Sequence, residues 1–331
     1  MELQAITNQA KTNDNLPYAP MPLEKSSSKA FIEANTIEIG LEEIKENHII
    51  PVFIKDNEPV ISQADFIQTM YDSVHEIFPN ETLLQPNIRL SHPIKGRIPE
   101  AKHKPANELL ETEKTLYYER MAFVIEIPTI FDEVQGNMLS LMVGGVKALN
   151  LDNLYNRKGA DEHFKIFIGF KNHVCTNLCV WTDGFMNDVK VNSLGMLKGV
   201  IKTLINNYNA SHHMHQLAKL GEVNLSEKQF AQIIGKLRLF QHLPKRMQAD
   251  ITPLLLGDSQ INAVARDYYK DESFCRIESG DINLWKLYNL FTGANKSSYI
   301  DNFVDRSVNA YQFIEQLRFC IQNKSLNWYL N

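Results

Sequence analysis

The sequence predicts an α+β fold: a mostly antiparallel sheet with helices packed on it forms the N-terminal half, and helices form the C-terminal half. Segments rich in aromatic and β-branched residues follow one another from Thr115 to Trp181, as is typical of strands. After Tyr208 the apolar residues recur at helical spacing. We therefore expect a sheet domain over residues 29–208 and a helical region over residues 209–331 packed on or beside it.

Composition places the chain among ordinary globular proteins. It has 331 residues, 44% of them hydrophobic and 22% charged, which is enough for one large domain or two smaller ones. The formal net charge of −5 argues against a generally basic coat for nucleic acid but leaves room for a local basic groove. The four cysteines lack the spacing of a disulfide scaffold, and no signal peptide or long apolar run is visible. We expect a reduced, cytoplasmic protein without a membrane segment.

The first elements of the chain follow from apolar content and spacing. Residues 1–28 contain few apolar side chains, so we expect a flexible arm or a segment that docks on a partner. Helical spacing predicts a helix over 31–46, and a short strand is expected over 49–54. Ser62 is an N-cap for the apolar-periodic run 64–78, which predicts a second helix.

Residues 89–104, RLSHPIKGRIPEAKHK, form the most distinctive polar segment of the chain. Because Pro93, Gly96 and Pro99 disfavour regular structure, we expect a loop. Its five bases are suited to a phosphate backbone, although a solvated loop with incidental lysines explains them as well. These bases are Arg89, Lys95, Arg97, Lys102 and Lys104. A short helix is expected over 105–113, with proline at its start and acids in its early turns.

Three strand patterns follow, over 115–128, 137–144 and 164–170. The residues Asp132–Gly136 are expected to join the first two strands as a hairpin. Between the second and third strands, residues 146–160 contain polar and basic side chains and predict an excursion over the sheet edge.

A fourth strand is expected over 173–181, because its side chains alternate between two faces. One face would carry His173, Cys175, Asn177, Cys179 and Trp181. Thr182–Gly184 predicts a turn after this strand. Ser193, with Asn192, can cap the helix predicted over 194–208, whose apolar residues form one buried stripe.

The C-terminal half predicts helices throughout. Residues 209–215 are polar and predict a link, and Ser226 opens a capping box for a helix over 227–243. Further helices are expected over 244–255, 259–269, 282–291 and 299–322. Gly293 is placed as a glycine after the end of a helix, and Ser298–Asp301 reads as another capping box.

Two histidine-containing patterns superficially resemble metal sites. His173, Cys175 and Cys179 form H-x-C-x₃-C, but the tight second ligand pair of a zinc site is missing, so buried cysteines are the simpler interpretation. The run from His212 to His215 lacks a nearby carboxylate and fits a polar link better than a metal site.

Carboxylates offer a third possibility, a divalent-ion site of the kind a nuclease requires. The candidates are Asp183, Asp188, Asp301 and Asp305. Capping and surface electrostatics explain the last two equally well. Gly293–Ser297 resembles part of a phosphate-binding loop but follows a helix, and no other catalytic or nucleotide-binding motif is found. No metal or cofactor is expected.

Five long segments resemble the domain-of-unknown-function family 3871 of bacterial conjugative transposons, plasmids and prophage-like islands. They are Arg89–Asn107, Lys114–Pro128, His163–Gly184, Glu227–Arg238 and Trp285–Ala310. The likeness covers about residues 30–330. A more remote similarity links Val174–Leu178, VCTNL, to the phage and plasmid-like family 932. The resemblance implies a cytoplasmic protein encoded on mobile DNA and carries over no catalytic residue.

Charge clustering and this setting favour a non-enzymatic accessory protein that binds single-stranded nucleic acid during transfer or recombination. The basic segment would act with Arg157, Lys165 and Lys171 at the sheet edge to follow phosphates. The side chains expected to stack on bases are Tyr117, Tyr118 and Trp181. One alternative is a protein-binding module that acts on a host defence or replication complex, with a host or element-encoded partner. The other is a metal-dependent nuclease.

Overall fold

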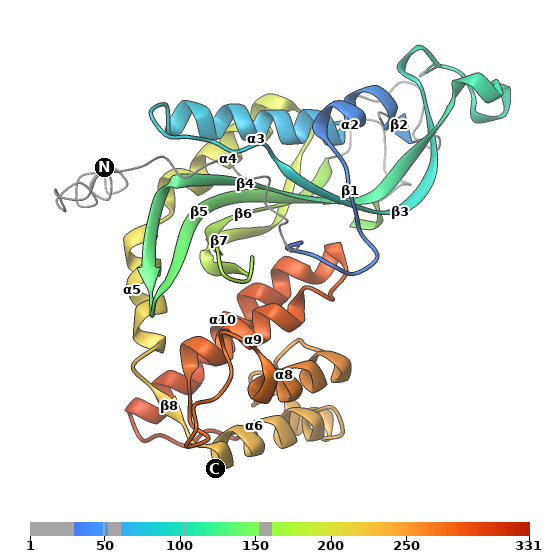
Figure 1. The fold of residues 1–331 in the computed structure, drawn as a ribbon. Coiled ribbons are helices and arrows are strands. Elements are labelled where there is room, and N and C mark those ends of the chain that lie inside the picture. Colours follow the sequence, from blue (N-terminus) through green and yellow to red (C-terminus); the bar gives the residue numbers. More distant parts are fainter. Residues whose placement is uncertain (1–29, 49, 52–60, 102, 152–160) are drawn as a thin grey trace.

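A seven-stranded antiparallel sheet organises the computed structural model, which describes residues 30–48, 50–51, 61–101, 103–151 and 161–331. The strand order is β1-β3-β4-β5-β6-β7, and β2 also pairs with β3 (Figure 1). The predicted α+β class, with a mostly antiparallel sheet in the N-terminal half, is therefore confirmed. The arm expected over residues 1–28 lies outside the described residues.

The strands run as a meander, because each strand from β3 to β7 pairs with the next along the chain. They are β1 Ile37–Glu38, β2 Ile50–Pro51, β3 Asn87–Arg97, β4 Lys114–Val134, β5 Asn137–Ala148, β6 Glu162–Asn172 and β7 Leu178–Val191. The predicted hairpin between β4 and β5 is confirmed. Its turn is only Gln135 and Gly136, with φ of 51° and 79°, which is the backbone that a two-residue hairpin loop requires.

Helices cover the sheet and make up most of the C-terminal half (Figure 1). They are α2 Leu41–Asn47, α3 Gln63–Ile77, α4 Leu194–Asn207, α5 Ala210–Leu220, α6 Glu227–Phe240, α7 Lys245–Gln248, α8 Asp258–Lys270, α9 Leu284–Asn295 and α10 Ile300–Gln322. A small pair, β8 Asn224–Leu225 and β9 Ile282–Asn283, lies in the helical half. Ser62 and Ser226 each form the capping box of their helix.

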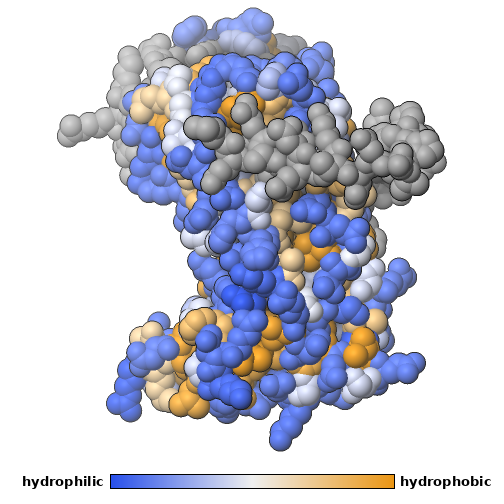
Figure 2. Space-filling view, turned by 90° about the vertical axis from the view of Figure 1, so that its left-hand side faces the viewer, coloured by the Kyte–Doolittle hydropathy of each residue, from blue (hydrophilic) through white to orange (hydrophobic). Residues whose placement is uncertain are grey.

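The two faces of the sheet are covered by different helices (Figure 1). One face packs against α2, α3 and α4, where the Phe66 ring lies 5.1 Å from Phe123 and 4.8 Å from Phe164. The other face buries Val124 and Phe167 in a cluster with Phe303 from the start of α10. Figure 2 shows that the molecule narrows between the sheet layer and the helical base. None of the helices in the described part of the chain combines the length and apolar character needed to span a bilayer.

The loop predicted over residues 89–104 is wrong in its first half, which forms β3. The prolines were read as breakers, but among the described residues only short strands pair with the outer edge of β3. β1 pairs with Arg89 and Leu90, and β2 pairs with Gly96 and Arg97. Pro93 lies between these two short partners, opposite Tyr118 of β4, and proline is tolerated at such edge positions of a sheet.

The turn predicted at Thr182–Gly184 is also wrong, because β7 continues through it to Val191. The chain reverses earlier, over residues 172–177, where Thr176 has a φ of 57°. Gly184 serves close packing, since a Cβ there would lie 2.2 Å from the Ile168 carbonyl oxygen.

Three further predictions are wrong in the helical half. The polar link expected over 209–215 is part of α5, whose N-cap Asn209 accepts a hydrogen bond from the His212 amide. Gly293 lies inside α9 rather than after its end. The expected capping box at Ser298–Asp301 does not form, because the N-cap of α10 is Tyr299 and makes no side-chain cap.

Several predicted helices are shorter in the structure. The helix expected over 31–46 is reduced to α2, and the one over 244–255 is reduced to α7. Residues 105–113 form two 3₁₀ turns, Ala106–Glu108 and Glu111–Glu113.

Candidate functional site

The basic segment lies on an arm formed by the far ends of β3 and β4, which extends beyond the rest of the sheet (Figure 1). We call residues 95–116 the arm tip. Arg97 is only 1% exposed, and its Nη1 donates hydrogen bonds to the carbonyl oxygens of Lys104 at 2.6 Å and Ala101 at 3.4 Å. Its guanidinium therefore orders the connection between the strands instead of facing solvent.

Acids from the same connection neutralise the other bases of the arm tip. Lys104 pairs with Glu113, and its hydrogen bond lowers the pKa of that carboxyl. Lys114 pairs with Glu111 at 2.5 Å and lowers the pKa of Glu111 in the same way. The described bases are Lys95, Arg97, Lys104 and Lys114, and the acids are Glu100, Glu108, Glu111 and Glu113. These charges cancel, so the described part of the arm tip is not a basic surface.

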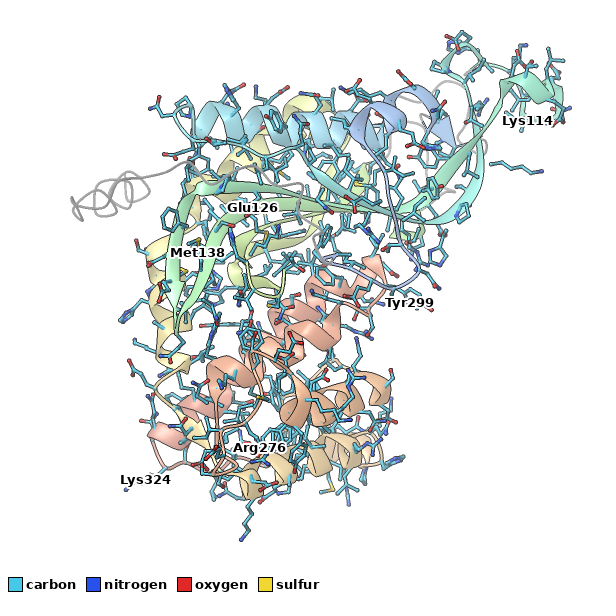
Figure 3. All side chains as sticks on the ribbon, viewed as in Figure 1. Lys114, Glu126, Met138, Arg276, Tyr299 and Lys324 are labelled. Atoms are coloured by element: carbon cyan, nitrogen blue, oxygen red, sulfur yellow. The ribbon has the colours of Figure 1, made fainter. Side chains whose placement is uncertain are left out.

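The remaining predicted bases lie in other places, each beside an acid. Arg89 contacts Glu38 at 3.2 Å, Lys165 contacts Asp305 at 2.5 Å, and Lys171 contacts Glu126 at 2.7 Å. Figure 3 labels Glu126, the partner of Lys171, in the body of the sheet and Lys114 at the distant arm tip, so the candidate bases among the described residues do not all meet on one surface. Two further candidates, Lys102 and Arg157, lie outside the described residues.

The aromatic side chains proposed for base stacking are mostly inside the protein. Tyr117 and Tyr118 are buried in the sheet layer. Trp181 is half-buried, with its ring stacked on His212 at 5.0 Å and tilted against Tyr311 at 5.9 Å. Its exposed area is therefore reduced by contacts with α5 and α10.

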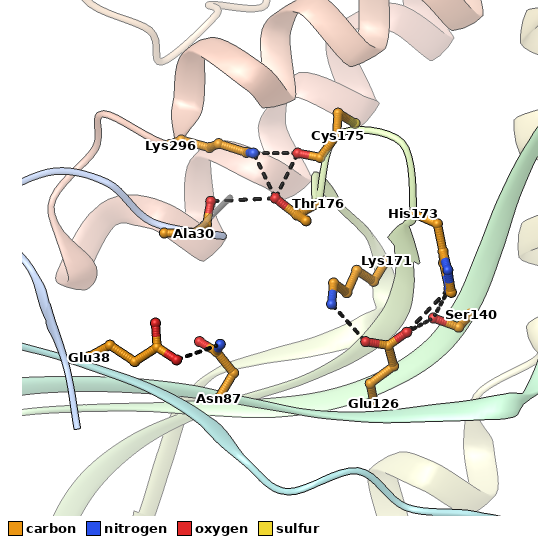
Figure 4. A network of polar contacts seen from close by, with 10 residues as sticks. All are labelled: Ala30, Glu38, Asn87, Glu126, Ser140, Lys171, His173, Cys175, Thr176 and Lys296. Atoms are coloured by element: carbon orange, nitrogen blue, oxygen red, sulfur yellow. Dashed lines mark hydrogen bonds and ion pairs between the residues drawn. The ribbon is translucent and has the colours of Figure 1, made fainter. Parts of the chain in front are cut away.

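A polar cluster lies on the sheet where three strands meet: Glu126, Ser140, Lys171 and His173 (Figure 4). Lys171 Nζ lies 2.7 Å from Glu126, Ser140 Oγ donates to the same carboxylate at 2.6 Å, and His173 Nε2 lies 3.2 Å from it. Burial by itself would raise the pKa of Glu126. The hydrogen bonds from His173, Lys171 and Ser140, together with the positive charge of Lys171, lower it to about 2.

The geometry of this cluster differs from a catalytic triad despite its serine, histidine and glutamate. A triad needs one ring nitrogen facing the serine and the other facing the carboxylate. Here the same nitrogen, His173 Nε2, lies 2.9 Å from Ser140 Oγ and 3.2 Å from Glu126. The Ser140 hydroxyl already donates to Glu126, so the imidazole has no serine proton to accept. The arrangement holds a buried carboxylate in its charged form.

A second polar group fixes the 172–177 turn to the helical half. The Asn172 amide donates to the Asn289 side chain at 3.1 Å, and the Asn177 amide donates to the Asn289 carbonyl at 2.9 Å. Lys296 Nζ donates to Thr176 Oγ1 at 2.8 Å (Figure 4). Because these groups are buried, each would lose its water without such a partner. They secure the contact between the sheet and α9.

The histidines and cysteines whose spacing resembled metal sites pack against other side chains. Cys179 is fully buried, and burial raises the pKa of its thiol, while Cys175 is half-buried beside Asn289. His213 is also fully buried; burial lowers its pKa to about 3, and its Nδ1 faces the Tyr208 hydroxyl at 2.5 Å. The described residues contain no group of three or more histidines, cysteines or carboxylates placed to hold a metal ion.

The sequence reasoning missed Glu126, Ser140, Asn289 and Lys296. Glu126 offered a signal, because it is the one charged residue in the apolar stretch AFVIEIP of β4. A carboxylate in such a strand needs a partner across the sheet. The Asn289 and Lys296 contacts offered none, since their partners lie more than a hundred residues away in the chain.

Comparison with known proteins supports the resemblance drawn from the sequence. The family described as "Domain of unknown function, B. Theta Gene description (DUF3871)" matches residues 20–330. No curated protein and no solved structure matches the chain.

Proposed function

The chain belongs to the family of unknown function DUF3871, and because that membership assigns no activity, we propose from its side chains that it is a non-enzymatic protein-binding module. The mobile-element setting, with a host defence or replication complex as the partner, is part of this proposal. Its docking element is the arm tip.

The observation that carries the proposal is a projection with exposed leucines, held by its own hydrogen bonds, in which the described bases and acids are equal in number. Leu110 and Leu116 are 60% and 45% exposed, whereas the neighbouring Leu109 is buried. The tip is held by the Arg97 hydrogen bonds and the Lys104–Glu113 pair, so it is ordered before any partner arrives. An element that is already ordered loses little conformational entropy on binding. Exposed leucines on a surface without net charge are expected to bind an apolar protein surface better than a phosphate backbone.

Binding of single-stranded nucleic acid stays a prediction, with weaker support. Counterion release from DNA requires lysines and arginines that are available to phosphates. Lys165 and Lys171 are held by acids, and Arg97 is buried.

The test is an affinity purification of the tagged full chain from cells, with nuclease treatment, comparing Leu110→Ser/Leu116→Ser with wild type. Leu194→Ser is the matched control, since Leu194 is 44% exposed on a different element, α4. We expect wild type and the control to retain the same protein partner and the arm variant to lose it.

Two results would count against this proposal. A partner retained equally by all three proteins would show that the arm does not bind it. A labelled single-stranded oligonucleotide that binds the full chain at low salt and dissociates as salt is raised would restore the nucleic-acid hypothesis.

A further inference from the structure

A short connection joins the C-terminal end of α6 to α7. Figure 1 shows α6 at the helical base, far from the arm. We call residues 238–247 the α6–α7 elbow. The Gln248 side-chain amide donates to the carbonyl oxygen of Phe240, the last residue of α6, at 3.1 Å and to that of Leu243 at 2.9 Å. This clamp holds α7 against the end of α6, so side chains from both helices stay close together.

The elbow carries positive charge that the protein neutralises only in part. Arg238, Lys245 and Arg246 are all exposed, and within the described residues none of the three makes an ion pair. Two exposed acids lie nearby: Asp250 follows in the chain, and Asp258 accepts hydrogen bonds from the Gln241 side chain of the elbow at 3.2 and 3.1 Å. Three bases against two acids leave one positive charge in excess, whereas the described bases and acids of the arm tip are equal in number. A chain with a formal net charge of −5 therefore keeps a small basic surface here.

Exposed apolar side chains lie among these cations. Leu239 is 59% exposed on α6, and Met247 is 45% exposed on α7. Leu239 follows Arg238 in the last turn of α6, and the exposed His242 comes shortly after the helix ends. The surface is thus both cationic and apolar.

We propose that the α6–α7 elbow docks an acidic protein segment that carries apolar side chains. Such a segment pairs its carboxylates with Arg238, Lys245 and Arg246 and covers Leu239 and Met247. A nucleic-acid strand fits less well, because strand binding combines cations with aromatic platforms. The one aromatic residue of the elbow, Phe240, is half-buried, with its ring 6.3 Å from that of Trp328. The elbow lies apart from the arm, so the tests of the two surfaces fail independently.

The probe is a fluorescein-labelled synthetic peptide whose repeating unit is two glutamates and one leucine. Its binding to the full chain is measured by fluorescence anisotropy at about 0.1 M salt, where the Debye length is about 10 Å. The test variant is Lys245→Glu/Arg246→Glu, and the apolar variant is Leu239→Ser/Met247→Ser. The matched control is Lys228→Glu/Lys270→Glu, which changes the net charge equally. Lys228 lies at the start of α6, roughly 20 Å along the helix from the elbow.

We expect the elbow charge reversal to weaken peptide binding by about tenfold or more and the control to leave it nearly unchanged. The apolar variant should weaken binding several-fold, and a peptide with serine in place of leucine should bind more weakly to wild type. Equal weakening by the elbow and control variants would overturn the proposal, because it would reveal binding to net charge alone. Undetectable peptide binding would also overturn it. So would an oligo(dT) probe that binds more tightly than the peptide and is lost with the elbow charge reversal.

Discussion

The buried carboxylate Glu126 makes a quantitative prediction about stability. Its pKa falls from an ordinary 4.5 to about 2 in the folded protein, where burial opposes and the contacts of His173, Lys171 and Ser140 favour the charged form. A carboxyl whose pKa is lowered on folding stabilises the protein above its unfolded pKa and loses that contribution as pH falls through its folded pKa. The shift corresponds to about 3 kcal/mol at pH 7, of which about 1 kcal/mol remains at pH 3.

We therefore expect Glu126→Gln to lower the free energy of unfolding by about 3 kcal/mol at pH 7 and by much less at pH 3. Urea unfolding followed by fluorescence at both pH values measures this, with a midpoint shift on the order of 1 M at pH 7. Glu76→Gln is the control. The hydrogen bonds of Lys198 and Lys202 also lower the pKa of Glu76 to about 2, but its side chain is 44% exposed and solvent screens the pairs. Equal shifts in both variants, or a Glu126 effect unchanged at pH 3, would refute the reasoning.

Four further variants test the fold by urea or thermal unfolding. Gly144→Ala should destabilise the protein by about 2 kcal/mol, since its Cβ would lie 2.4 Å from the Phe123 carbonyl oxygen, whereas Gly199→Ala, in open space within α4, should stabilise it by up to about 1 kcal/mol. Asn289→Ala should cost about 2 kcal/mol because it removes a buried partner of the 172–177 turn. The free energy of unfolding of wild type should fall by about 2 kcal/mol between pH 7 and pH 5 through His213, because its imidazole binds a proton in the unfolded chain but not in the folded protein, where its pKa is about 3. His213→Phe should not show this decrease.

Local signals predicted the fold well, because the interactions behind them span only a few residues. The capping boxes at Ser62 and Ser226 join a residue to the third one after it, and both helices begin where those serines stand. The meander followed from aromatic and β-branched runs separated by turn residues. Pro93 and Gly184 misled the prediction, because their roles depend on what lies beside them in the sheet. The sequence of one segment does not show whether a strand edge is unpaired or which carbonyl lies beside a glycine.

The candidate site was harder to predict, because ion pairs form between residues distant in sequence. Lys165 meets Asp305 across 140 residues, and Lys171 meets Glu126 across 45. At the arm, the whole connection between the strands has to be counted, since the acids Glu108, Glu111 and Glu113 offset most of the bases of the preceding stretch. The same count over the α6–α7 elbow leaves it positive.

The elbow and the arm therefore differ in net charge, and this difference decides which partner each can bind. At the arm tip, Lys104 and Lys114 pair with acids of the same connection and the described charges cancel, so binding there depends on Leu110 and Leu116. At the elbow the cations keep their hydration, and an acidic partner gains by replacing that water with carboxylates. Added salt should weaken binding at the elbow and leave binding at the arm nearly unchanged, because screening acts on charge and not on apolar burial. A partner whose affinity is insensitive to salt is therefore expected at the arm.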